Sequence, residues 1–93
     1  MKIIYLDSAL TDLEWLRAYY EAVFPEGAAA AYERLANAHA LLSANPHIGR
    51  PSNNPTHLRI LPIARTPFQL VYRITRTHIE ILHVRDSRGG IVE

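Results

Sequence analysis

The chain has 93 residues, 48% of them hydrophobic, which favours one folded domain over a disordered chain. It contains no cysteine, and this excludes disulfide bonds, thiolate zinc sites and thiol nucleophiles. No apolar run approaches the roughly 18 residues of a membrane-spanning helix, and the N-terminus lacks a signal-peptide pattern. We therefore expect a single domain over residues 1–93, located in the cytoplasm.

The formal net charge is only +1, but the charges are unevenly distributed along the chain. Residues 1–49 hold three basic and six acidic residues, whereas residues 50–93 hold seven arginines and three acidic residues. The planar guanidinium group of arginine suits carboxylates, phosphates and aromatic faces. We therefore expect a partner to bind the basic half. The alternative is that these arginines lie solvated on a polar strand face.

The first half of the sequence predicts a strand followed by two helices. Residues 2–6 are β-branched and aromatic, as in a short strand. Asp7 or Ser8 could then cap a helix over about 9–23, where apolar residues recur at steps of three and four. A similar pattern predicts a second helix over about 26–44. Because the break between them is short, the two helices should form an antiparallel hairpin.

The second half predicts a loop followed by three strands. Residues 45–55 carry three of the six prolines and are rich in turn formers. Strands are predicted over 58–63, 68–75 and 79–85. Pro62 lies inside the first of these, which indicates an edge position or a bulge.

Alternation in the strand 68–75 predicts which of its faces the helices cover. The apolar row should be covered, and the other row should be left open. The apolar row is Phe68, Leu70, Tyr72 and Ile74, and the other row is Gln69, Val71, Arg73 and Thr75. In the last strand, the same alternation places Ile79, Ile81 and His83 opposite Glu80, Leu82 and Val84.

The element order predicts an α+β fold, β-α-α-β-β-β, with the helix hairpin packed on one face of an antiparallel sheet. Counting chain reversals makes the first strand antiparallel to the strands 58–63 and 79–85.

Several segments, in their order and spacing, are similar to a known family. They are Ser8-Ala9 with Asp12-Leu13, Tyr19-Tyr20, Asn45-Pro46-His47-Ile48-Gly49-Arg50-Pro51, Leu58-Arg59-Ile60-Leu61, Phe68-Gln69-Leu70-Val71-Tyr72-Arg73-Ile74 and Ile79-Glu80-Ile81-Leu82-His83-Val84-Arg85. Together they resemble the RelE/ParE superfamily of bacterial type II toxins, also called plasmid stabilisation proteins. The resemblance covers roughly residues 3–88, and it implies the helix hairpin and antiparallel sheet predicted above.

The resemblance also implies partners and two possible activities. Members are inhibited by a cognate antitoxin whose disordered segment folds around the toxin. RelE-like members cleave messenger RNA in the ribosome, whereas ParE-like members inhibit DNA gyrase without nuclease chemistry. A third possibility is a non-toxic binding module, such as a degenerate homologue.

The residues that RNA cleavage would need favour the ParE-like branch. Metal-free cleavage requires a base, an acid and cations around the phosphate. RelE-like nucleases commonly have an arginine where this chain has Gln69, and the superfamily commonly has a histidine where it has Asp86. The strand 58–63 offers Arg59 alone, and Lys2 is the only lysine. We therefore expect gyrase inhibition by binding rather than enzymatic activity, with RelE-like ribosome-dependent mRNA cleavage as the alternative.

The candidate residues for binding the target or the antitoxin are Arg59, Arg73, Arg85 and Arg88. We expect them on the open face of the sheet, or else as solvated arginines paired with Glu80 and Asp86. His83 could be a general base, but packing with a satisfied nitrogen is the commoner role. The five histidines lack metal-ligand spacing, and neither a metal nor a cofactor is expected.

An aromatic group on the first helix also allows two interpretations. Trp15, Tyr19 and Tyr20 could form an exposed recognition patch or pack between the helices and the sheet.

Overall fold

The computed structural model describes residues 1–53 and 57–86, and its helices and strands follow the predicted order closely. In chain order they are β1 (Lys2–Tyr5), α1 (Asp7–Val23), the 3₁₀ turn η1 (Pro25–Gly27), α2 (Ala28–Ala44), β2 (Arg50–Pro51), β3 (Arg59–Pro62), β4 (Phe68–Ile74) and β5 (His78–Asp86). The short strand β2 lies in the segment that the sequence predicts as a loop. Of the two α-helices described, neither is both long and apolar enough to cross a membrane.

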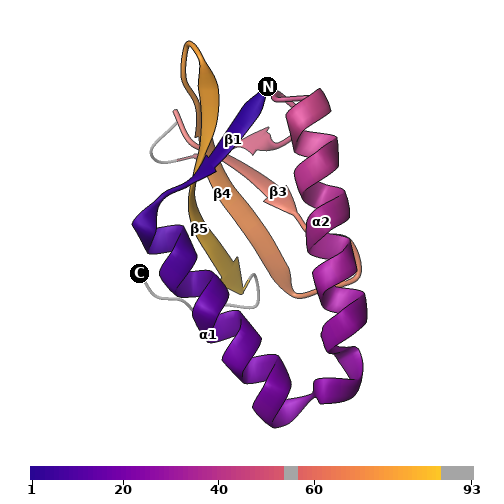
Figure 1. Cartoon of the computed structure of the whole chain (residues 1–93). Coiled ribbons are helices and arrows are strands. Elements are labelled where there is room, and N and C mark those ends of the chain that lie inside the picture. The colour runs from indigo at the N-terminus through magenta and orange to yellow at the C-terminus, as the bar shows by residue number, and fades with distance from the viewer. Residues whose placement is uncertain (54–56, 87–93) are drawn as a thin grey trace.

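The described strands form one mixed sheet in the order β1-β5-β4-β3-β2 (Figure 1). Neighbours from β5 to β2 are antiparallel, but β1 runs parallel to β5. The α+β class is confirmed, while the predicted antiparallel direction of the first strand is wrong. That prediction assumed that the chain reverses its direction between β1 and α1. Figure 1 shows β1 and α1 both descending through the view, so this connection does not reverse the chain.

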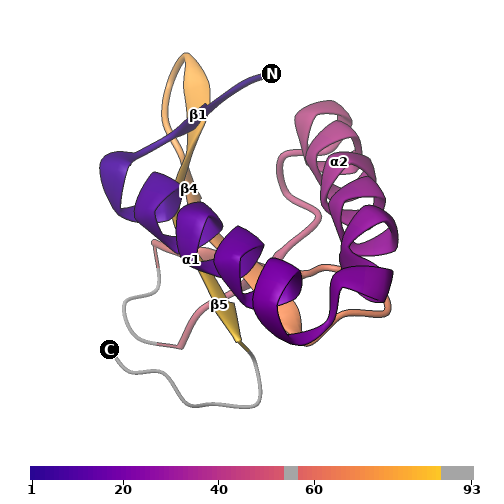
Figure 2. The same cartoon turned by 60° about the horizontal axis from the view of Figure 1, so that its bottom comes forward.

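The core lies between the two helices and one face of the sheet. Leu70, Tyr72, Ile79 and Ile81 from the sheet are fully buried, as is Leu42 of α2. From Figures 1 and 2, α1 crosses over β5 while α2 rises beside β3, and the helices diverge from their connection at η1. The predicted covered row of β4 is therefore confirmed, because its members all belong to the core cluster or pack against it.

A β-bulge in β5 changes which of its residues face the core. Tyr72 pairs with Ile81, but the preceding residue Val71 pairs with His83, so Leu82 is the extra residue. Beyond the bulge the alternation changes phase, and Val84 is buried in place of His83. The predicted faces of the last strand are thus right as far as Leu82 and wrong for His83 and Val84.

Helix α1 continues the edge of the sheet where β1 ends. The Leu6 N–H donates to the Ile81 carbonyl at 3.0 Å, the Ser8 hydroxyl to the Leu82 carbonyl at 2.6 Å, and the Val84 N–H to the Asp12 carboxylate at 3.0 Å. The predicted cap by Asp7 or Ser8 is wrong. The N-cap residue is Leu6, and no side chain caps the helix. The Ser8 hydroxyl instead binds the Leu82 carbonyl and holds α1 against β5.

Pro62 lies at an edge, as its ring requires. Strand β2 pairs only with Arg59 and Ile60, so it ends before Pro62. On its other side Pro62 pairs with Gln69 of β4.

Candidate functional site

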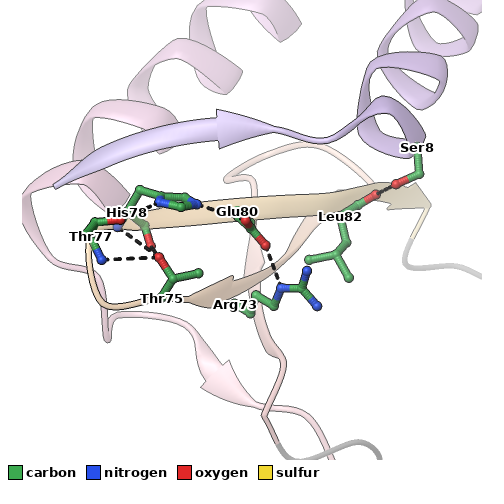
Figure 3. Close-up of polar contacts among 7 residues, drawn as sticks. All are labelled: Ser8, Arg73, Thr75, Thr77, His78, Glu80 and Leu82. Carbon is green, nitrogen blue, oxygen red and sulfur yellow. Dashed lines mark hydrogen bonds and ion pairs between the residues drawn. The ribbon is translucent and has the colours of Figure 1, made fainter.

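The face of the sheet turned away from the helices, called the open face below, is built from rows of cross-strand neighbours. Its residues are Lys2, Ile4, Arg50, Ile60, Pro62, Gln69, Val71, Arg73, His78, Glu80, His83 and Arg85, with the bulge residue Leu82 beside His83. Val71 is buried but does not belong to the core cluster, as expected for a residue on this face. Figure 3 shows Arg73, Glu80 and Leu82 on the side of the sheet opposite α1.

A charged cluster occupies the end of the open face near the β4–β5 turn (Figure 3). One oxygen of the Glu80 carboxylate accepts a hydrogen bond from Arg73 Nε at 2.7 Å, and the other lies 2.9 Å from His78 Nε2. The hydrogen bonds from His78 and Arg73 lower the pKa of Glu80 below its usual 4.5. The cluster is anchored because the Thr75 hydroxyl closes the turn on the His78 backbone.

Arg85 lies across from Gln69 at the other end of the open face and is partly exposed. Within residues 1–53 and 57–86 its side chain makes no hydrogen bond or ion pair. Its guanidinium group is therefore available to a partner as far as the described chain is concerned. Gln69 is a neutral neighbour that adds a hydrogen-bonding amide but no charge.

Arg59 does not share a face with Arg73 and Arg85. It pairs with Tyr72 across β3 and β4, which places it on the covered face. Its guanidinium group donates to the carbonyls of His47 and Gly49 and so holds the segment that follows α2. Arg88, the fourth arginine predicted for binding, lies outside the described residues.

The histidines of β5 are both hydrogen-bonded to carboxylates. His83 Nδ1 lies 3.1 Å from the Asp12 carboxylate, which also accepts the Val84 N–H. His83 thus has a satisfied nitrogen, which is the commoner of the two roles considered for it. Asp12, on the helix, is a contact that the sequence did not reveal, since α1 and β5 are 71 residues apart at this point.

The sequence also did not reveal a groove between α2 and the β3–β4 turn. Its volume is about 350 Å³, and it joins a second hollow of about 380 Å³ through shared residues Ala30, Arg34 and Arg65. Small alanine side chains on this flank of α2 leave the space open. Leu41 and Phe24 remain about half exposed at its rims, and Arg34 donates to the Arg65 carbonyl at 3.3 Å.

The aromatic group on α1 is divided between the two predicted roles. Trp15 is 59% exposed and stacks on Tyr19, with the ring centroids 5.6 Å apart. Tyr20 is buried in the core and contacts Phe68.

Replacing Glu80 with glutamine should make stability less dependent on pH. The lowered pKa means that the ionised carboxylate stabilises the folded state above about pH 4.5, and that this stabilisation is lost as the pH falls through the lower folded-state pKa. Urea midpoints of wild type and Glu80→Gln should therefore differ more at pH 7 than at pH 3. Glu21→Gln, in an exposed pair with Arg17, is the control and should change little at either pH. An undiminished difference at pH 3 would contradict this role of the Glu80 charge.

Comparison with known proteins decides the family. A family model described as the ParE toxin of the type II toxin–antitoxin system parDE matches residues 3–89. The chain belongs to the ParE toxin family. The predicted membership of the RelE/ParE superfamily, and of its ParE-like branch, is thereby confirmed.

A solved structure agrees with the ParE assignment. A chain from the structure described as "Chromosomal ParDE TA system from P. aeruginosa" is 29% identical, with a TM-score of 0.78. The match covers 92% of this ParE toxin and 95% of that chain. No curated protein matches the sequence. The family match over residues 3–89 includes both helices and every described strand residue except Lys2, and therefore most of the open face and the whole groove.

Proposed function

We propose that this ParE toxin inhibits DNA gyrase by binding it and that a cognate antitoxin neutralises the toxin. The proposal includes a cytoplasmic location, because gyrase acts on DNA there. The observation that carries it is the ParE family match over residues 3–89. The residues of the sheet also support the proposal. Gln69 stands where RelE-like nucleases commonly have an arginine, and His78 and His83 are hydrogen-bonded to Glu80 and Asp12. These described residues suit a binding surface better than acid–base cleavage of RNA.

The groove beside α2 supports the antitoxin part of the proposal. A solved relative comes from a ParDE toxin–antitoxin system. Here the groove combines an alanine-lined floor and apolar rims with two arginines, Arg34 and Arg65, and one carboxylate, Glu33. An amphipathic segment with carboxylates beside its apolar face would match that chemistry.

A supercoiling assay with the purified full chain tests the proposal. We expect micromolar toxin to inhibit gyrase-driven supercoiling of a relaxed plasmid. Relaxation of the same plasmid by topoisomerase I is the control and should be unaffected, because the toxin acts on gyrase rather than by coating DNA. Unaffected gyrase together with codon-linked cuts on translating ribosomes would instead establish the RelE-like activity.

A further inference from the structure

We propose that the open face binds a protein surface of gyrase that carries carboxylates around an apolar centre, rather than the DNA that gyrase holds. This inference rests on the proposed gyrase inhibition and adds to it the binding face and the chemistry of the partner.

An apolar band crosses the middle of the open face. Val71 pairs with Ile60 of β3 on one side and with His83 of β5 on the other, and the bulge places Leu82 beside His83. Val71 is buried, while Ile60 and Leu82 are partly exposed. Figure 3 shows the Leu82 side chain pointing away from α1. The band therefore offers apolar surface to a partner outside the core, as the centre of a protein interface does.

Cations lie on both sides of this band. Arg73 is in the row toward the β4–β5 turn, and Arg85 is in the row beyond Val71, next to Gln69. Lys2 and Arg50 add charge at the two edge strands. Against these four cations the described residues place two carboxylates at this face: Glu80, which pairs with Arg73, and Asp12 of α1, which bonds to His83 at the edge of the sheet. The surface is accordingly complementary to an acidic partner.

The ion pair with Glu80 holds the guanidinium group of Arg73 in one orientation. The pair uses Arg73 Nε at 2.7 Å, and the side chain remains 40% exposed. The two terminal nitrogens of Arg73 have no hydrogen-bond partner among the described residues. They therefore present a planar pair of donors in the geometry that binds a carboxylate through both oxygens.

The arrangement favours protein over nucleic acid for two reasons. Binding to a DNA backbone relies on cations that replace counterions along the phosphates, and Glu80 would lie among those phosphates as an opposing charge. The apolar band would face the same phosphates without a complementary surface. A protein partner matches both features, because arginines around an apolar centre are typical of the residues that dominate protein interfaces.

Binding of the full-length toxin to purified gyrase subunits in the absence of DNA tests the inference. We expect wild type to bind, and Arg85→Glu and Arg73→Gln each to weaken binding and supercoiling inhibition at least tenfold. Arg85→Glu is the cleaner variant, since Arg85 has no described partner to lose. Arg17→Glu on exposed α1 is the matched charge control and should stay within twofold of wild type. Circular dichroism and thermal melting establish that each variant is folded.

The contrary outcomes are distinct. Inhibition by folded Arg85→Glu and Arg73→Gln at wild-type strength would overturn the open face as the binding surface while leaving gyrase inhibition intact. Binding that requires DNA would overturn the protein partner. A change from dimer to monomer in Arg85→Glu would show that a second copy of the chain occupies this face. Failure of wild type to inhibit gyrase would overturn the proposed function itself, and this inference with it.

Discussion

Replacing Gly49 with alanine should destabilise the fold by about 1–3 kcal/mol, because the position has no room for a methyl group. A Cβ atom at this buried glycine would lie 2.7 Å from both Cε1 and the hydroxyl oxygen of Tyr72, and 2.9 Å from the Ile60 carbonyl oxygen. Tyr72 is itself fully buried and hydrogen-bonded, and the carbonyl belongs to β3. Neither neighbour can move without disturbing the sheet.

Gly27→Ala is a matched control, because its neighbours differ in kind. The three atoms nearest to a Cβ atom there all belong to the ring of Phe24, which is half exposed and can move toward solvent. Gly27 also has helical dihedral angles, φ −91° and ψ −5°, which alanine adopts readily. Urea unfolding should show a clear loss for Gly49→Ala and a change within about 0.5 kcal/mol for Gly27→Ala. Equal stability of the two variants would contradict the close packing at Gly49.

Local pattern was enough to predict the helices, the later strands and the covered face. The alternation of Phe68, Leu70 and Tyr72 sets their burial because side-chain direction in a strand has period two. Helix periodicity similarly identified α1 and α2 to within two residues of their ends. These features depend on neighbours within one segment, and such neighbours are visible in a sequence.

The features that sequence could not predict depend on contacts between distant segments. The bulge at Leu82 changes the phase of β5 only because of its register with β4. The face of Arg59 depends on its pairing with Tyr72. The direction of β1 depends on how the chain turns at Leu6, where backbone hydrogen bonding to Ile81 replaces a polar cap. In each case the local residue type allowed more than one arrangement, and long-range pairing selected one.

The same distinction explains why the four candidate arginines differ. Arginine alone does not reveal whether its guanidinium group will bind a partner or the chain's own carbonyls. Arg59 lies near the carbonyls that end the loop after α2 and binds them. Arg73 binds the Glu80 carboxylate through one of its three nitrogens, and Arg85 lies across from the neutral amide of Gln69. The two on the open face therefore keep donors for another molecule, and binding by them remains the prediction to test.

Replacing Tyr72 with phenylalanine should cost about 1–3 kcal/mol, although it removes a single oxygen atom. The Tyr72 hydroxyl donates to the Pro46 carbonyl at 2.7 Å and accepts the Gly49 N–H at 2.9 Å. Burial raises the pKa of Tyr72, while the Gly49 bond and the Arg59 charge lower it in part. Without the hydroxyl, the buried Gly49 N–H would lose its acceptor, and water could not readily replace it.

Tyr5→Phe is the control, because its hydroxyl bonds to the His39 side chain at 3.0 Å between two partly exposed residues. Water can hydrate His39 after that change, so we expect a smaller loss, below about 1 kcal/mol. Urea unfolding gives both values, and amide hydrogen exchange at Gly49 should accelerate in Tyr72→Phe relative to wild type. If Tyr72→Phe cost no more than Tyr5→Phe and left exchange at Gly49 unchanged, the hydroxyl would not be what holds the loop after α2 to the sheet. Such a result would assign that role to Arg59, which binds the same loop through the carbonyls of His47 and Gly49.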